Sequence, residues 1–199
     1  ARPPRRRSGR RGASLHLLDA FTGGPLWSRP LPGAPLAGPA LCGNVALVAT
    51  CDPGGAGRPG ITAIETATGV PLWRRAVPGL DRGFAWLPVD DRIVVNVAGG
   101  HAVALHAPTG DVAWEMRPGP DSPRDVPARL EPVLRGGALF LPAAAVHVVR
   151  PDDGEVIHRL DEGPVPDYLR VDERCHLYVG EHSGHMSAFG LVARLAVVK

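Results

Sequence analysis

The sequence predicts an all-β fold, a β-propeller built from four-stranded antiparallel blades, on three observations. The 199 residues include 25 Gly and 22 Pro, scattered between short apolar runs, which favours many turns and few long helices. A Thr-Gly-x-x-x-Trp pattern recurs along the chain. Its copies lie roughly 40–45 residues apart, which is the period of a propeller blade.

The repeated turn is the clearest internal signal. Four segments of equal length align without gaps, beginning at positions 17, 63, 104 and 148. Three of them contain Thr-Gly-x-x-x-Trp, whereas the fourth keeps the glycine and places a histidine where tryptophan belongs. A fifth copy begins at Ala188 and then loses the turn. We therefore expect about four blades, half of a ring of seven or eight. The motif residues are Thr22, Gly23, Trp27, Thr68, Gly69, Trp73, Thr109, Gly110, Trp114, Gly154 and His158.

The strands are predicted from a second recurring block upstream of each turn. Residues 45–50, 93–97, 138–141 and 177–180 are short runs rich in β-branched or aromatic residues. Each is followed by a small or polar break and a further apolar run, which predicts a hairpin. Another strand precedes the next copy, as at residues 84–87. Together these give four short strands in each repeat.

The glycine and the tryptophan of the motif have separate roles. The glycine can adopt the positive φ that the turn requires, and the preceding polar residue can bond to the turn backbone. The tryptophan falls on the emerging strand, where it can wedge between adjacent blades. Binding of an aromatic ligand is the less favoured interpretation, because the residue recurs at matched positions. We expect Trp73→Ala to cost about 3–5 kcal/mol of stability.

The N-terminal residues 1–13 are predicted to be a disordered linker that is rich in Arg and Pro. Six arginines lie within the first eleven positions, although the formal net charge of the chain is only +2. A nucleic-acid or anionic-lipid patch is the alternative, but no aromatic residue interleaves the arginines. The segment lacks the apolar core of a secretory signal, and the sequence starts with alanine. We expect the chain to be the C-terminal part of a longer protein.

The motifs resemble those of a known repeat family. Residues 19–27 with their copies, and residues 177–189, are similar to the PQQ-like, quinoprotein-type tryptophan-docking β-propeller repeat, and the resemblance covers residues 14–199. It implies a partial propeller and leaves the function open. We expect a non-catalytic module for protein or ligand binding or for scaffolding. The alternatives are a fragment of a PQQ-dependent quinoprotein dehydrogenase and the sensor domain of a bacterial signalling protein. Complete members resemble closed rings.

The sequence favours a protein that is not an enzyme and has no cofactor. A quinoprotein dehydrogenase resembling the family would need two adjacent cysteines and acidic and amide calcium ligands. Cys42, Cys51 and Cys175 are dispersed, and Asn44 and Asn96 are the only asparagines. PQQ with calcium is therefore expected only under the dehydrogenase alternative.

A metal site is the weakest of the candidates. Cys175, His182 and His185 form the only metal-like cluster, with His176 on the same strand. Zinc accepts such ligands, but the histidines are more simply explained as exposed turn residues. No metal is therefore expected, and these three residues remain candidates.

The expected partners follow from the incomplete ring. Half a ring would expose sheet faces and a strand edge. We expect these to be covered by a protein partner, by missing blades of the same chain, or by a second copy in a homodimer. No nucleic-acid partner is expected, and no run of about 20 apolar residues predicts a transmembrane segment. The resemblance favours the bacterial cell envelope or periplasm, although the sequence shows no signal peptide.

Overall fold

The computed structural model describes residues 12–51, 58–117, 130–160, 166–180 and 184–190. These residues form eighteen β-strands and one short 3-10 helix, η1 (Leu80–Arg82). The prediction of an all-β protein is confirmed. None of the described residues belongs to a helix with the length and apolar character needed to cross a membrane.

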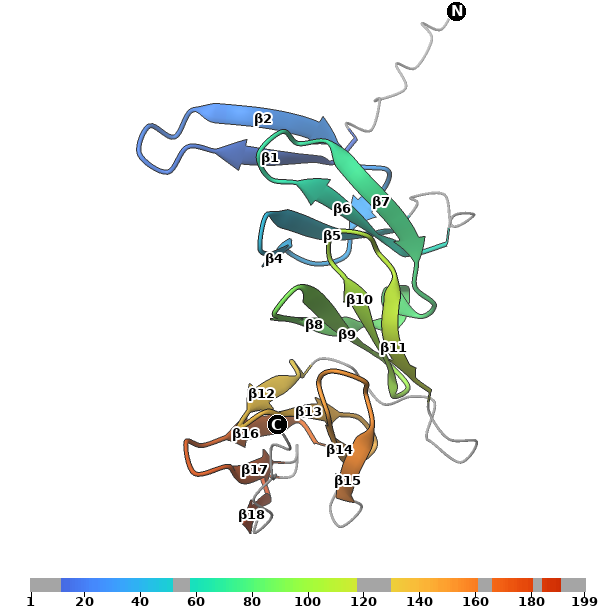
Figure 1. Cartoon of the computed structure of the whole chain (residues 1–199), viewed down its shortest axis with the longest axis vertical. Coiled ribbons are helices and arrows are strands. Elements are labelled where there is room, and N and C mark those ends of the chain that lie inside the picture. Colours follow the sequence, from blue (N-terminus) through green and yellow to red (C-terminus); the bar gives the residue numbers. More distant parts are fainter. Residues whose placement is uncertain (1–11, 52–57, 118–129, 161–165, 181–183, 191–199) are drawn as a thin grey trace, which may run out of the picture.

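The strands form five antiparallel sheets that follow the order of the chain (Figure 1). Sheet 1 contains β1 (Ser14–Leu18) and β2 (Pro25–Pro30). Sheet 2 contains β3 (Ala34–Pro35), β4 (Ala40–Cys42), β5 (Val45–Cys51), β6 (Gly60–Glu65) and β7 (Pro71–Ala76). Sheet 3 contains β8 (Phe84–Val89), β9 (Arg92–Val97), β10 (His101–His106) and β11 (Val112–Met116).

The two remaining sheets complete the array. Sheet 4 contains β12 (Val133–Arg135), β13 (Ala138–Pro142), β14 (Val146–Val149) and β15 (Val156–Leu160). Sheet 5 contains β16 (Tyr168–Val171), β17 (His176–Gly180) and β18 (Met186–Gly190). In sheet 2, β3 and β4 pair with successive parts of β5 and together take the place of one strand.

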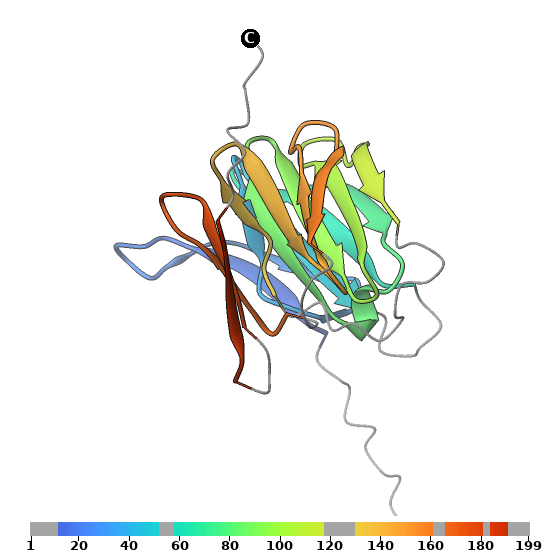
Figure 2. The same cartoon turned by 90° about the horizontal axis from the view of Figure 1, so that it is seen from below.

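The sheets stack face to face, and the core lies between them (Figure 2). One cluster of buried residues, which includes Leu47 and Leu105, joins sheets 2 and 3. A second, which includes Val94 and Leu139, joins sheets 3 and 4, and a third joins sheets 4 and 5. The inner strands are nearly continuous runs of buried aliphatic residues because both of their faces are covered.

The expectation of about four blades needs a finer description. Sheets 2, 3 and 4 are complete four-stranded units, whereas the described part of sheet 1 has two strands and that of sheet 5 has three. The Gly23 turn lies between β1 and β2 of sheet 1, whereas the Gly154 turn lies between β14 and β15 of the complete sheet 4. The predicted linker falls almost entirely on residues 1–11, which lie outside the described residues.

Candidate inter-sheet docking sites

All four Thr-Gly or Asp-Gly turns have the same backbone geometry. Gly23, Gly69, Gly110 and Gly154 have φ angles of 68°, 70°, 74° and 73°. The N–H of each donates to the carbonyl four residues earlier, over 2.7–2.9 Å. Left-handed φ values favour glycine because it has no Cβ, so the sequence fixes these turns locally.

The residue before each glycine stabilises the turn through its side chain. Thr22, Thr68 and Thr109 each accept a hydrogen bond at Oγ1 from the N–H two residues further on, over 3.2–3.3 Å. Oδ1 of Asp153 accepts the equivalent bond from Glu155 over 3.0 Å. Threonine and aspartate are therefore interchangeable at this position because each offers an oxygen acceptor.

The first turn has an additional acceptor. Oδ1 of Asp19 accepts bonds from the N–H groups of Thr22 and Phe21 and from the Thr22 hydroxyl, over 2.7–3.0 Å. The N–H of Thr22 makes the largest contribution to lowering the pKa of Asp19 below its usual value. Bonds to the charged form favour that form, so the carboxylate is fixed in the turn at neutral pH.

Each motif tryptophan docks on the glycine of the next sheet. A Cβ added to Gly69 would lie 2.7 Å from Cδ2 of Trp27, and one added to Gly110 would lie 2.6 Å from Cδ2 of Trp73. Gly154 stands in the same relation to Trp114, also at 2.6 Å. The flat indole therefore lies against backbone that only glycine leaves bare.

The indole N–H fixes the position of each ring. Nε1 of Trp27, Trp73 and Trp114 donates to the carbonyls of Thr66, Ala107 and Pro151, over 2.8 Å in each case. Each acceptor lies three residues before the receiving glycine. Trp114 is buried, with 6% of its surface exposed, and the other two rings are half-buried. The rings thus act between sheets, as the motif predicts.

A second inter-sheet contact was not anticipated from the sequence. Arg29 donates from Nε to the carbonyl of Gly69 over 2.7 Å, and Arg75 donates in the same way to Gly110 over 2.6 Å. Both arginines lie two residues after the motif tryptophan and so on the same face of the strand. The pattern Trp-x-Arg in two of the three tryptophan copies was the available signal.

The contact between sheets 3 and 4 uses a different arginine. Met116 occupies the position of Arg29 and Arg75, and Arg92 instead donates from Nη1 to the carbonyls of Pro151 and Asp152, over 3.3 and 3.0 Å. The carbonyl of Pro151 therefore receives both the indole and the guanidinium. The Gly154 turn is therefore held by donors from two strands of sheet 3, Trp114 on β11 and Arg92 on β9.

A buried thiol adds a polar contact between sheets 2 and 3. Sγ of Cys42 lies 3.3 and 3.4 Å from the carbonyl oxygens of Asp90 and Arg92, to which it can donate. Burial raises the pKa of Cys42, and the nearby Asp91 and Asp90 add to the effect. The thiol therefore stays protonated at neutral pH and is a weak nucleophile. None of the three cysteines, all within the described residues, is in a disulfide bond.

The first turn of the motif series differs from the other three, and the last copy of the motif has no tryptophan. Among the described residues, apart from its two chain neighbours, no atom lies within 4 Å of the place where a Cβ on Gly23 would stand. His158, in the tryptophan position of sheet 4, is exposed on β15 and pairs with Val148. Docked indoles thus occupy three of the four turns.

The metal candidates are not brought into one site by the described residues. Cys175 lies at the turn before β17, with a φ of 61°, whereas His185 precedes β18, and His182 lies outside the described residues. His176 bonds through Nδ1 to Asp172 over 2.8 Å. Within the described ranges, no three His, Cys, Asp or Glu side chains are grouped so that they could hold a metal ion.

PQQ with calcium stays a prediction of the dehydrogenase alternative. None of the three cysteines is in a disulfide bond, and the side-chain amide of Asn96 in sheet 3 donates to the carbonyl of Pro142 over 2.7 Å. A calcium site needs several converging oxygen ligands, and the described part of the chain groups no three His, Cys, Asp or Glu side chains.

The geometry defines a β-propeller repeat protein in which sheets 1, 2 and 3 each dock a tryptophan on a glycine turn of the next sheet. A family comparison agrees with this class, and the resemblance to PQQ-like repeats is confirmed. The chain belongs to the family described as outer membrane protein assembly factor BamB, whose model matches residues 11–167. No curated protein matches the chain in sequence.

Solved structures show the same fold at low sequence identity. BamB from Moraxella catarrhalis has a TM-score of 0.57 and 18% identity, and the match covers 88% of this chain and 52% of that one. The computationally designed Ika8 protein has a TM-score of 0.66 and 16% identity, with the same two coverages. The chain therefore spans about half the length of these two proteins.

A redox enzyme is also among the structural neighbours. The quinohemoprotein alcohol dehydrogenase ADHIIG from Pseudomonas putida HK5 has a TM-score of 0.55 and 17% identity. The match covers 91% of this chain and 40% of that enzyme. At such identity the likeness concerns the fold, which hosts unrelated functions.

Proposed function

We propose that this chain is a non-catalytic propeller module that binds other proteins as a scaffold in the bacterial envelope. The observation that carries the proposal is the open turn at Gly23. It has the backbone geometry of the three turns that receive an indole, yet the part of the chain that the structure describes places no atom beyond its chain neighbours within 4 Å of its Cβ position. A protein surface that supplies an aromatic side chain fits this turn.

The repeat supplies the contacts that such a surface would make. Each docked indole donates to the carbonyl three residues before the receiving glycine, and in the first turn this carbonyl belongs to Ala20. The Gly23 carbonyl corresponds to the acceptor of the Arg29 and Arg75 guanidiniums. The Gly23 turn thus offers a flat backbone surface and two acceptors.

Exposed apolar side chains surround the same turn. Phe21 is 99% exposed, Leu26 62% and Leu18 53%. Contiguous apolar surface is typical of interaction sites, and aromatic residues are enriched in the centres of protein interfaces. The partner is expected to cover these three side chains together with Gly23.

The envelope location and the type of partner are supported by the family. Its description is an assembly factor of the outer membrane, and assembly factors act by binding other proteins. The chain spans about half of BamB from Moraxella catarrhalis, so the partner surface can come from further sequence of the same protein, from a second copy or from another protein.

Site-specific photo-cross-linking in bacterial cells tests the proposal. A benzophenone amino acid at Phe21 should give a discrete cross-linked protein in the envelope fraction, and the same group at the exposed Arg135 should not. Mass spectrometry of the product distinguishes a second copy from a different protein. Equal cross-linking at both positions, or none at Phe21, would refute the proposal.

A redox assay addresses the dehydrogenase alternative separately. We expect the purified chain supplied with PQQ and calcium to show no dye reduction with alcohols or sugars. The described residues group no metal ligands, which supports this expectation. Turnover above that of the free quinone would contradict a non-catalytic role.

A further inference from the structure

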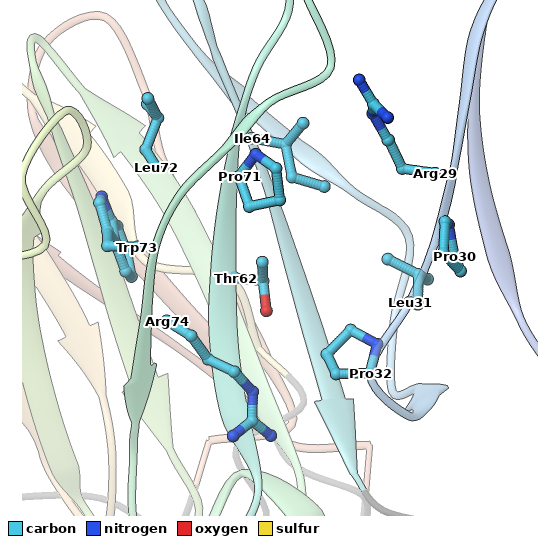
Figure 3. Close-up of a pocket in the computed structure, with 10 residues that line it drawn as sticks. All are labelled: Arg29, Pro30, Leu31, Pro32, Thr62, Ile64, Pro71, Leu72, Trp73 and Arg74. Carbon is cyan, nitrogen blue, oxygen red and sulfur yellow. The ribbon is translucent and has the colours of Figure 1, made fainter.

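A cavity of about 680 Å³ lies between sheets 1 and 2 (Figure 3). One wall is formed by the end of β2 and the residues that follow it, including Leu31 and Pro32, and the other by β6 and β7. Its volume is within the roughly 300–1,000 Å³ of small-molecule sites, which combine an apolar lining with few polar groups.

The equivalent space between sheets 2 and 3 is filled. The repeat aligns Leu31 with Val77 and Thr62 with Val103. Val77, Val103 and Leu80 of η1 are 3%, 5% and 1% exposed and belong to the same core cluster. Leu31 is only half-buried, and no helix follows β2. The interface between sheets 1 and 2 therefore keeps a cavity that side chains fill at the equivalent interface between sheets 2 and 3.

A buried hydroxyl lines this cavity. Thr62 on β6 is 6% exposed, and its Oγ1 has no hydrogen-bond partner among the described residues. Its side chain lies between those of Ile64 and Arg74, with the oxygen towards the Arg74 end (Figure 3). Burying an unpaired hydroxyl costs free energy, which valine at the equivalent position avoids. A ligand that bonds to Thr62 would remove this cost.

Two guanidiniums flank the apolar lining. Arg29 is held at its Nε and Nη2 by the carbonyls of Gly69 and Thr68, over 2.7 and 3.3 Å. Arg74 makes one long bond, 3.4 Å, to the carbonyl of Arg58. Among the described residues, neither arginine has a carboxylate partner. Both groups therefore keep donors for an anion.

The charge at the cavity edge is specific to this interface. The repeat aligns Arg74 with Glu115 of sheet 3. Glu115 is paired with His101 over 2.9 Å and with Arg117 over 3.2 Å. At this position sheet 3 carries a negative charge, Glu115, that is paired. Sheet 2 carries a positive charge, Arg74, that has no carboxylate partner among the described residues.

From these observations we propose that the cavity binds a small organic acid with an apolar body. Arg74 receives the carboxylate, to which the Thr62 hydroxyl also donates. The apolar body packs against Leu31, Ile64 and Leu72. This site is separate from the Gly23 turn and does not depend on the scaffold function.

Calorimetric titration of the whole chain with 4-phenylbutyrate tests the site, with 4-phenylbutyramide as the uncharged comparison. Loss of charged hydrogen bonds costs about 1.5–3 kcal/mol, or roughly 10- to 100-fold in affinity. We expect the amide to bind weaker by such a factor. Arg74→Glu, which installs the residue of sheet 3, should weaken the acid similarly. Arg135→Glu makes the same charge change on exposed β12 and should leave binding unchanged.

Thr62→Val separates binding from folding, because it installs the residue found in sheet 3. We expect it to retain or raise the melting temperature and to weaken binding by a few-fold, as for a hydrogen bond of about 1 kcal/mol. The proposal is overturned if millimolar acid gives no saturable binding to the unmodified chain. It is also overturned if acid and amide bind equally, or if Arg74→Glu and Arg135→Glu have the same effect.

Discussion

The Gly23 turn and the Gly110 turn have nearly the same backbone and different surroundings. Their φ angles are 68° and 74°, and in both the glycine N–H is bonded to the carbonyl four residues earlier. Trp73 covers Gly110, whereas no side chain of the described residues covers Gly23. The comparison teaches that the turn forms from its own residues, while the docked indole comes from the neighbouring sheet.

The largest effect is expected from removing a docked indole. Trp114→Ala should lower the free energy of unfolding by about 3–5 kcal/mol, because the ring is buried and its N–H is bonded. Its counterpart His158 is exposed, so His158→Ala should change stability by less than about 0.5 kcal/mol. Urea unfolding measures both. Equal losses in the two variants would show that tryptophan docking does not hold the sheets together.

The two glycine turns give the next largest difference. Gly23→Ala should cost about 1–2 kcal/mol, because alanine is strained at a left-handed φ. Gly110→Ala bears the same strain and also places a Cβ 2.6 Å from Trp73, which should add about 1–3 kcal/mol of overpacking. The difference between their melting temperatures measures the docking contact alone. This difference should disappear when each of the two glycine substitutions is made separately in a Trp73→Ala background.

The smallest effect is expected at the arginine two residues after the tryptophan. Arg75→Met, which copies Met116 of sheet 3, should cost about 0.5–1.5 kcal/mol, because a half-buried hydrogen bond to the Gly110 carbonyl is lost. Arg74→Met is the control, since Arg74 is exposed and makes one long bond, and it should be close to neutral. Thermal unfolding of the two variants decides whether the guanidinium contributes to docking.

Most of the fold was predictable, because the signals are local and repeated. The left-handed glycines and their Thr or Asp neighbours produce turns without help from distant residues. The alternation of short apolar runs and breaks places strands such as β8, β9 and β17 close to their observed bounds. The repeat spacing then fixes how many turns the chain contains.

The docking partners were only partly predictable. The motif indicates that an indole wedges between sheets, and the structure shows which carbonyl it bonds to. Arg29 and Arg75 were missed, because an arginine on an exposed strand is usually a solvated charge. Its acceptor lies 35 to 40 residues away. Arg92, which replaces them between sheets 3 and 4, lies on another strand and has no counterpart in the motif.

The sequence by itself determined the turns, the strand pattern and the class of the protein, because these depend on residues a few positions apart. Only the tertiary structure decided that one interface is sealed by Val77 and Leu80 while its neighbour keeps a cavity beside Thr62. The reason is physical: a void or an unpaired hydroxyl is a property of side chains that meet from different sheets, and the spacing along one chain does not contain it.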